Sequence, residues 1–269
     1  MTNERFLTLA RESFAALEGN SVRLAGEVGE IPVLEAPAVG IAAADDPLFR
    51  QYRDGEVIGA DFRPPCEWMP EAKSVVAFFF PFSEEVRRRA RAGEALTSPA
   101  WNAAYGANFK LVDAFLDILV PRLEAEGARV CQPNRDPALV RNTLAVTRGG
   151  EEDIHVSVGW SNRHAGFAAG LGTFGIHRHL ITEKGCCGTM ATFITDAALI
   201  PTPRDYTEVY GYCTRCGACA GRRPAGAITP GNLRNLKKCA AQAGVIREKF
   251  GGGFCGRCLV GIPCEHERP

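Results

Sequence analysis

The chain has 269 residues, 46% hydrophobic and 23% charged, which is the composition of an ordinary soluble globular protein. Its 31 basic and 31 acidic residues give a net charge of +0, so composition offers no sign of a nucleic-acid-binding or membrane-binding surface. No apolar stretch reaches the ~18 residues that a membrane-spanning helix needs. The N-terminus has neither a secretory signal core nor a twin-arginine pair, so we expect a cytoplasmic protein without a membrane partner.

The first third of the sequence predicts a helix, a strand and a second helix. Residues 4–18 place Phe6, Ala10 and Phe14 on one stripe, as in an amphipathic helix. Residues 74–80 form a continuous apolar run that ends at Pro81, which is typical of a strand buried on both faces. The arginine run 87–89 follows two glutamates, and this pattern predicts a solvent-exposed helix face.

The middle of the chain continues the alternation of helices and strands. Residues 109–126 predict a helix that ends before Gly127 and is kinked at Pro121. Residues 128–131 and 154–160 predict short strands, and the second has alternating apolar side chains: Ile154, Val156 and Val158. Interleaved helices and strands indicate an α/β body. The composition then shifts to cysteine, glycine and arginine, so we predict a domain boundary near residue 205.

A glycine-rich segment, Ala-Ala-Gly-Leu-Gly-Thr-Phe-Gly, occupies residues 168–175. A dinucleotide-binding loop would follow a strand and open a helix. Here the glycines are expected to end a helix that begins near Asn162, and residues 180–182 are expected to form a strand. Two interpretations stay open: a helix C-cap with a tight turn, or a loop whose backbone closely approaches a flat cofactor.

Three cysteines, Cys213, Cys216 and Cys219, follow the spacing C-x2-C-x2-C. This spacing is typical of a [4Fe–4S] cluster, whose fourth thiolate comes from a distant segment. A bacterial ferredoxin run would end in C-x3-C-P, but Arg223 stands in the place of the last cysteine before Pro224.

A second cysteine set follows the first. In two-cluster ferredoxins the last cysteine of each run ligates the other cluster. Applied here, that rule predicts a complete four-cysteine set: Cys213, Cys216, Cys219 and Cys264. It leaves a three-thiolate site of Cys239, Cys255 and Cys258, one ligand short because of Arg223. That site would use a non-cysteine ligand, hold a three-iron cluster or be empty.

Zinc coordination and disulfides are alternative roles for these cysteines. Cys213 and Cys216 with Cys255 and Cys258 match a zinc ribbon, but the third cysteine of the run is then surplus. Disulfides do not suit a reducing compartment. The adjacent Cys186 and Cys187 could supply the missing ligand, although small core residues in a turn are expected there. Isolated Cys66 and Cys131 are expected to be buried hydrophobes.

The sequence resembles the epoxyqueuosine reductase-like family over about residues 60–264. The resemblance is carried by these segments: 67–70 (EWMP), 74–82, Trp101 and Tyr105, 160–165 (WSNRHA), 169–175 (AGLGTFG), 179–182 (HLIT), 195–196 (TD) and the two cysteine sets. It implies an α/β, nitroreductase-like cobalamin-binding body at residues 1–205 and a C-terminal ferredoxin-like domain for two clusters at residues 206–269. The family is related to reductive dehalogenases, so the resemblance implies a reductase.

The chain departs from that family at three places. The reductases carry a catalytic aspartate where the alignment places Val156. Their Gly-Arg-Asp-Tyr-His stretch reads Gly-Ala-Asn-Phe-Lys at residues 106–110, and Arg223 replaces a cluster cysteine. The chain is therefore expected to be a divergent member, for which epoxyqueuosine reduction is doubtful and a tRNA partner stays open.

The resemblance also implies site residues. The cofactor-binding set is Arg163, Gly170, Leu171, Gly172, Thr173 and Gly175. A reductase needs a proton donor near its metal. Five titratable residues lie near the matched motifs: Tyr105, His155, His164, His177 and His179. We predict Tyr105 and His164 as the catalytic residues.

Two functions follow from these observations. The first is an oxidoreductase in which electrons pass from [4Fe–4S] clusters to cobalamin and then to a small-molecule substrate. Its electron donor would be a protein such as a ferredoxin or flavodoxin. The second is a non-catalytic electron-transfer or corrinoid-handling protein, which the absent aspartate and the incomplete second cysteine set favour.

Overall fold

A four-stranded antiparallel sheet forms the centre of the computed structural model, which describes residues 1–92, 97–222, 225–229, 233–252 and 255–269. The strand order is β3 (Ala38–Ala43), β4 (Ser74–Pro81), β10 (Gly188–Thr195) and β5 (Val130–Cys131). All eight residues of β4 are buried, as the apolar run predicts. Its alternate side chains serve two separate cores: Val76, Phe78 and Phe80 on one face, and Val75, Ala77 and Phe79 on the other.

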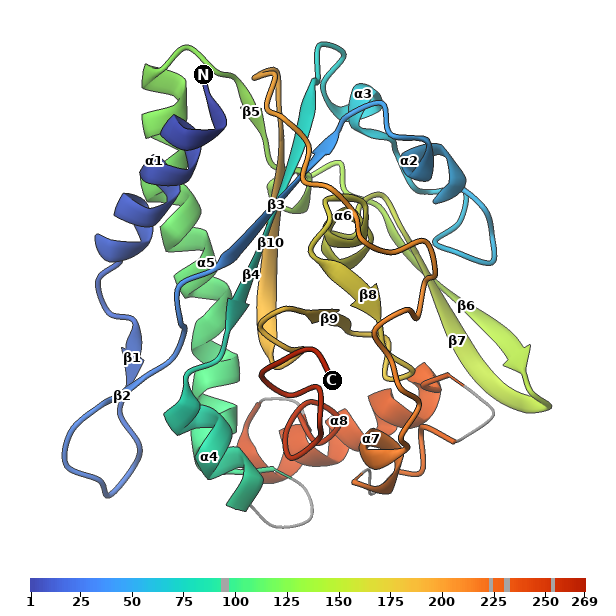
Figure 1. Ribbon diagram of the computed structural model, residues 1–269. Coiled ribbons are helices and arrows are strands. Elements are labelled where there is room, and N and C mark those ends of the chain that lie inside the picture. The colour runs from blue at the N-terminus through green and yellow to red at the C-terminus, as the bar shows by residue number, and fades with distance from the viewer. Residues whose placement is uncertain (93–96, 223–224, 230–232, 253–254) are drawn as a thin grey trace.

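Helices cover both faces of the sheet (Figure 1). On one face lie α1 (Asn3–Ala15) and α5 (Pro99–Ala125), where the rings of Phe78 and Phe115 are 5.1 Å apart. On the other face lie α2 (Pro47–Gln51), α3 (Pro65–Trp68) and α6 (Asn162–Ala168). There Trp160 stacks on Phe49 and Phe62. The predicted mixed α/β body is confirmed.

Helix α5 begins earlier than the predicted residue 109. The hydroxyl of Ser98 accepts a hydrogen bond from the amide of Trp101, and Pro99 occupies the first turn, so capping starts the helix there. Gly127 lies just beyond the end of the helix with φ of +83°, the left-handed conformation that favours glycine. Pro121 lies inside α5, and a kink at that residue stays a prediction.

The hairpin of β6 (Arg141–Arg148) and β7 (Glu151–Val158) corrects a prediction about side-chain direction. Asp153, His155 and Ser157 of β7 are buried although they are polar, whereas Ile154 and Val156 are only half-buried. Of the three predicted apolar positions only Val158 is buried. Polar partners explain the burial. Arg148 lies 3.2 Å from the Asp153 carboxylate, and His155 Nε2 lies 2.8 Å from a backbone carbonyl oxygen of the 53–61 loop.

The remaining described elements are short, apart from α4 and α8. They are β1 (Ser21–Val22), β2 (Ile31–Pro32), α4 (Glu84–Ala92), the 3-10 helix Pro133–Arg135, β8 (Gly172–Phe174), β9 (Leu180–Thr182), α7 (Ala218–Gly221) and α8 (Leu236–Phe250). Helices α4, α7 and α8 gather with the C-terminus at one end of the sheet (Figure 1). Buried Cys219, Cys258 and Cys264 belong to the same apolar cluster as Phe115. The domain boundary near residue 205 stays a prediction.

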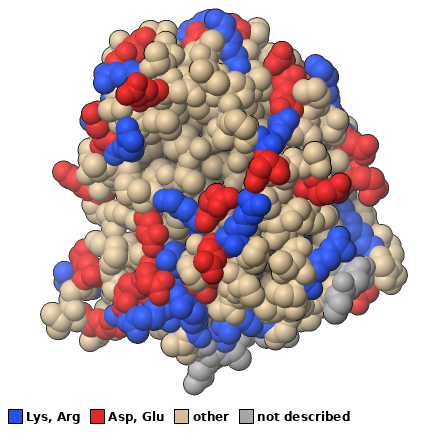
Figure 2. All heavy atoms as spheres, in the orientation of Figure 1, with Lys and Arg blue, Asp and Glu red and all other residues tan. Residues whose placement is uncertain are grey.

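Surface charge is mixed in sign. Figure 2 shows basic and acidic side chains interspersed over the visible face, in keeping with the balanced net charge. Among the described residues no helix is both long and apolar enough to cross a membrane.

The arginine run in α4 is not wholly exposed, contrary to the sequence prediction. Arg87 is 6% exposed and donates to the carbonyl oxygen of Phe82 at 2.6 Å. Its guanidinium also lies 3.1 Å from Glu84 and 3.2 Å from Glu35. Arg88, one residue on, is exposed and pairs with Glu85.

Replacement of Arg87 with methionine should lower the free energy of unfolding by about 2 kcal/mol, because charge-assisted hydrogen bonds are lost while the apolar stem is kept. Arg88→Met is the matched control and should change stability by less than about 0.5 kcal/mol, since exposed pairs contribute little. Urea unfolding of both variants measures the difference. Equal effects of the two substitutions would contradict a structural role for Arg87.

Candidate metal centre

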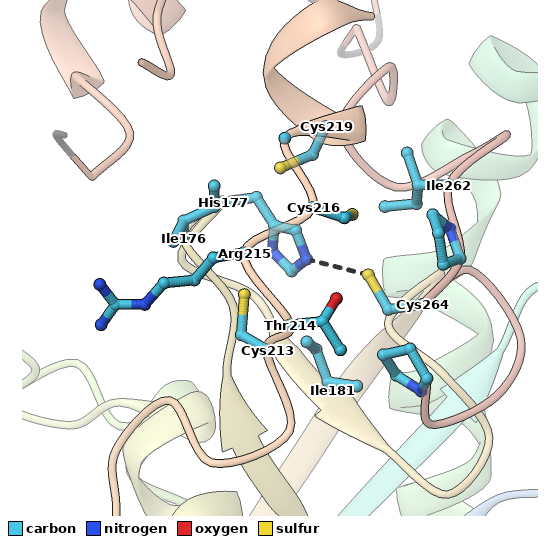
Figure 3. A pocket seen from close by; sticks show the side chains of 13 residues that line it. Ile176, His177, Ile181, Cys213, Thr214, Arg215, Cys216, Cys219, Ile262 and Cys264 are labelled. Carbon is cyan, nitrogen blue, oxygen red and sulfur yellow. Dashed lines mark hydrogen bonds between the residues drawn. The ribbon is translucent and has the colours of Figure 1, made fainter. Parts of the chain in front are cut away.

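Four cysteines from two segments line one pocket at the end of the sheet. Cys213 and Cys216 come from the loop that leads into α7, Cys219 lies within α7, and Cys264 comes from the C-terminal segment. Figure 3 shows their sulfur atoms arranged around the pocket. Apolar residues form much of its wall: Ile176, Ile181, Ile262, Pro263 and Pro269. The sequence-predicted four-cysteine set is therefore brought together, whereas Cys255 and Cys258 of the zinc-ribbon alternative do not line this pocket.

The loop geometry places the first three thiols. Arg215 has φ of +53° and Gly217 has φ of +78°, and the chain bends at Gly217 before α7 begins. Upstream, the amide of Tyr212 donates to the hydroxyl of Thr173 on β8 at 2.8 Å. This bond holds the cysteine loop against the β8–β9 hairpin, which supplies part of the pocket wall.

Backbone pairing places the fourth thiol. The amide of Cys186 donates to the carbonyl oxygen of Cys264 at 2.8 Å, and that of Cys187 to the carbonyl oxygen of Glu265 at 3.0 Å. Gly185 permits this approach, because a Cβ there would lie 2.4 Å from the Glu265 oxygen. The C-terminal segment is thus held opposite the 213–219 loop.

The electrostatics of the pocket suit a cation. Burial and the neighbouring Cys258 and Cys264 thiols raise the pKa of Cys219 to about 12. Hydrogen bonds from Cys186 and His177 lower the pKa of the Cys264 thiol. Neighbouring thiols disfavour one another's ionisation unless a metal compensates their charge, and metal binding would release their protons. All eleven cysteines, each within the described residues, are free thiols.

The second predicted site is only partly described. Cys239 on α8 and Cys255 are half-buried and Cys258 is buried, and Arg223 lies outside the described residues. A three-thiolate site there stays a prediction.

Buried donors around that region fit an anionic group. The loop that carries Cys255 and Cys258 packs on α5, since a Cβ at Gly256 would lie 2.2 Å from the Trp101 ring. The indole nitrogen of Trp101 and two guanidinium nitrogens of Arg222 are buried without a hydrogen-bond partner among the described residues. An iron–sulfur cluster carries negative charge and sulfur acceptors that would satisfy such donors.

The glycines of segment 168–175 meet the protein's own chain. Gly170 follows the end of α6 with φ of +80°, as a helix C-cap requires. A Cβ at Gly172 would lie 1.9 Å from the carbonyl oxygen of Ile181, and a Cβ at Gly175 would lie 2.6 Å from the His177 ring. Leu171 and Thr173 are buried. These contacts support the C-cap and tight-turn interpretation, and a cofactor contact by residues 170–175 stays a prediction.

Arg163 and Tyr105 lie close enough to affect each other's ionisation. Burial and the Arg234 cation lower the pKa of Arg163 to about 10, although its side chain is exposed to solvent. Burial raises the pKa of Tyr105, which keeps its hydroxyl protonated. Arg163 and Tyr105 therefore offer a cation and a proton donor that lie near each other.

His164 has a different environment. It packs between Tyr52 and Phe174, with ring centroids 5.1 and 5.0 Å away. Burial lowers the pKa of His164 to about 3, so the neutral imidazole is strongly favoured. The predicted role of His164 as a proton donor would need the protonated ring, which this environment disfavours.

Sequence reasoning did not anticipate the position of Cys186. It was expected to be a small core residue, and it is buried, but its thiol also contacts Cys264 Sγ. No local pattern signals this contact, because it depends on backbone pairing between segments that are distant in sequence.

No protein-family model matches the sequence, and no curated protein matches it. Solved structures do. Epoxyqueuosine reductase from Streptococcus thermophilus has a TM-score of 0.57 at 14% identity, covering 99% of this chain and 67% of that chain. The Bacillus subtilis reductase has a TM-score of 0.51 at 18% identity, covering 98% and 67%. A catabolic reductive dehalogenase in complex with 3-bromo-4-hydroxybenzoic acid has a TM-score of 0.55 at 16% identity, covering 86% of this chain but 30% of its own.

These similarities confirm the predicted resemblance at the level of the fold. The chain shares the fold of the reductases over nearly all of its length, and it spans about two thirds of their chains. It matches less than a third of the dehalogenase chain.

Proposed function

We propose that the chain is an iron–sulfur reductase that receives electrons at the Cys213, Cys216, Cys219 and Cys264 site and uses them to reduce a substrate at a corrinoid. The observation that carries the proposal is the convergence of these four thiols on one pocket. Four thiolates from a C-x2-C-x2-C loop and one distant cysteine are the ligand set of a [4Fe–4S] cube. Support for the reductase comes from the shared fold with the reductases and the dehalogenase.

The chain's own residues prepare the pocket for electron transfer. Ile176, Ile181 and Ile262 surround the thiols with apolar surface. Apolar surroundings restrict solvent access to a cluster and help to set its reduction potential. The exposed side of the loop, where Cys216 lies, is the natural approach for an electron donor such as a ferredoxin or flavodoxin.

The region of Arg163 and Tyr105 is the proposed corrinoid and substrate site. A solved dehalogenase with this fold is described as acting by B12-dependent dehalogenation. Bound there, a corrinoid would supply the metal at which the substrate is reduced. Arg163 would hold a carboxylate or phosphate through its forked donors, and Tyr105 would deliver a proton from its hydroxyl.

The test is anaerobic reconstitution with iron, sulfide and cobalamin, followed by turnover with a chemical reductant. Two probes should be compared: an epoxyqueuosine-modified tRNA stem loop and 3-bromo-4-hydroxybenzoic acid, which occur in solved structures with this fold. Product from either probe supports the enzyme. If the loaded protein binds cobalamin but converts neither probe, the reductase function would require a different substrate.

Tyr105→Phe should lower turnover by about 10²- to 10⁴-fold, the usual contribution of a positioned acid. The ring is kept, so packing against Trp101 and Phe109 is preserved. Cobalamin binding and iron content should not change. Unaltered turnover in this variant would remove Tyr105 from the mechanism.

The alternative is a non-catalytic electron-transfer or corrinoid-handling protein. One observation favours it: half-buried Val156 on β7 stands where the resemblance would place the catalytic aspartate. This function predicts reversible reduction of the cluster and tight cobalamin binding without turnover of any substrate.

A further inference from the structure

Two buried side chains outside the four-cysteine set point at the sulfur of Cys264. The thiol of Cys186 donates to Cys264 Sγ across 3.9 Å. His177 Nε2 lies 3.6 Å from the same sulfur (Figure 3). Cys186 and His177 are each 1% exposed, so water does not compete for these contacts.

The hydrogen-bonding of the His177 ring fixes where its proton lies. The backbone amide of His179 donates to His177 Nδ1 at 3.1 Å, so Nδ1 acts as the acceptor. A neutral imidazole with an accepting Nδ1 carries its proton on Nε2. His177 therefore presents an N–H donor to Cys264 Sγ.

A tight turn holds the ring in this position. The amide of Gly175 donates to the carbonyl oxygen of His179 at 2.9 Å. The amide of Arg178 donates to the carbonyl oxygen of Gly175 at 2.8 Å. Arg178 adopts φ of +60°, which is uncommon for a residue with a side chain. A Cβ at Gly175 would lie 2.6 Å from His177 Nε2, so glycine is needed there for the ring to face the pocket.

We propose that His177 and Cys186 act as positioning residues that donate hydrogen bonds to the cluster ligand Cys264 and thereby raise the reduction potential of the cluster. This rests on the proposed function, since it requires a cluster at the four cysteines. Hydrogen bonds to ligand sulfurs are among the factors that set such potentials. One-electron reduction adds negative charge to the cluster, so each donor stabilises the reduced state more than the oxidised state.

The test is a redox titration of the reconstituted full chain, in which EPR follows the reduced cluster. His177→Leu and Cys186→Ala should each shift the midpoint potential to more negative values, and the double variant should shift it further. His177→Gln places an amide N–H near the Nε2 position and should restore part of the shift. Gly175→Ala should displace the ring and act in the same direction as His177→Leu, which provides a second route if His177→Leu fails to fold.

Cys187→Ala is the matched control. Cys187 is adjacent to Cys186 and equally buried, but the described contacts give its thiol no hydrogen bond to Cys264 Sγ. Its loss should leave the potential unchanged.

The outcomes distinguish a failure of the proposed function from a failure of this inference. A wild-type chain that binds no cluster would overturn the proposed function and this inference together. With the cluster loaded, unchanged potentials in His177→Leu and Cys186→Ala would overturn the inference alone. Loss of iron in His177→Leu, with iron retained in Cys187→Ala, would make His177 a ligand instead of a donor and would also overturn it.

Discussion

Cys216→Ala should remove about four irons per chain from anaerobically reconstituted protein, because one cube needs all four thiolates. Cys216 is the most exposed thiol of the pocket, so its replacement disturbs packing least. The visible absorbance and EPR signal of this cluster should vanish while the helical content is kept. Iron analysis and circular dichroism on the same sample measure both.

Two further variants test the fourth ligand and the specificity of the iron loss. Cys264→Ala should lose the same iron, because Cys264 lines the same pocket as the three cysteines of residues 213–219. Cys66→Ala is the control, since Cys66 does not line the pocket and, contrary to the sequence prediction of burial, is exposed on α3. Cys131, also predicted to be buried, is half-buried. Iron that survives in Cys264→Ala would contradict the cross-ligation from the C-terminal segment.

Gly172→Ala should destabilise the protein by about 3 kcal/mol or more, because the new Cβ would overpack a site whose neighbour cannot move. The Cβ would lie 1.9 Å from a backbone oxygen of Ile181, at a φ of +152°. Gly172 pairs with Thr182 across the β8–β9 hairpin. That hairpin carries Ile176, His177 and Ile181 into the pocket, so iron binding should be lost along with stability.

Gly127→Ala is the matched control for Gly172→Ala. It has φ of +83° but no atom within 4 Å of an added Cβ, so it tests the cost of a positive φ without overpacking. Its cost should be about 1 kcal/mol. Urea unfolding and iron analysis of both variants give the comparison. Normal stability in Gly172→Ala, with loss of cobalamin binding only, would instead indicate that Gly172 lines the cobalamin site.

The sequence predicts those parts of the fold whose signals are local. Strand β4 is an unbroken apolar run, and α1 has one apolar stripe, so burial and periodicity suffice. The C-x2-C-x2-C spacing likewise predicts three ligands by itself, and the cross-ligation rule adds Cys264.

Features that depend on distant partners were missed. The buried face of β7 is polar because Arg148 and a loop carbonyl oxygen satisfy Asp153 and His155, and the apolar alternation concealed this. Arg87 is buried because Glu35, far away in sequence, and Glu84 flank it. The contact of Cys186 with Cys264 Sγ needs the C-terminal segment to fold back.

The glycine loop illustrates a pattern with two physical explanations. The atoms that lie against Gly172 and Gly175 belong to Ile181 and His177 of the chain itself, and a close approach to a cofactor stays a prediction. A glycine indicates that there is no room for a side chain at its position, but the sequence does not identify the atoms that occupy that room.

Iron and acid-labile sulfide analysis of the anaerobically reconstituted wild-type chain tests the central claim most directly. The convergence of Cys213, Cys216, Cys219 and Cys264 predicts at least about four irons and as many sulfides per chain. Cys216→Ala should reduce the iron content and the sulfide content by about four atoms each per chain, the content of one cube. A single tightly bound zinc ion without sulfide, or iron content that does not respond to Cys216→Ala, would contradict the account.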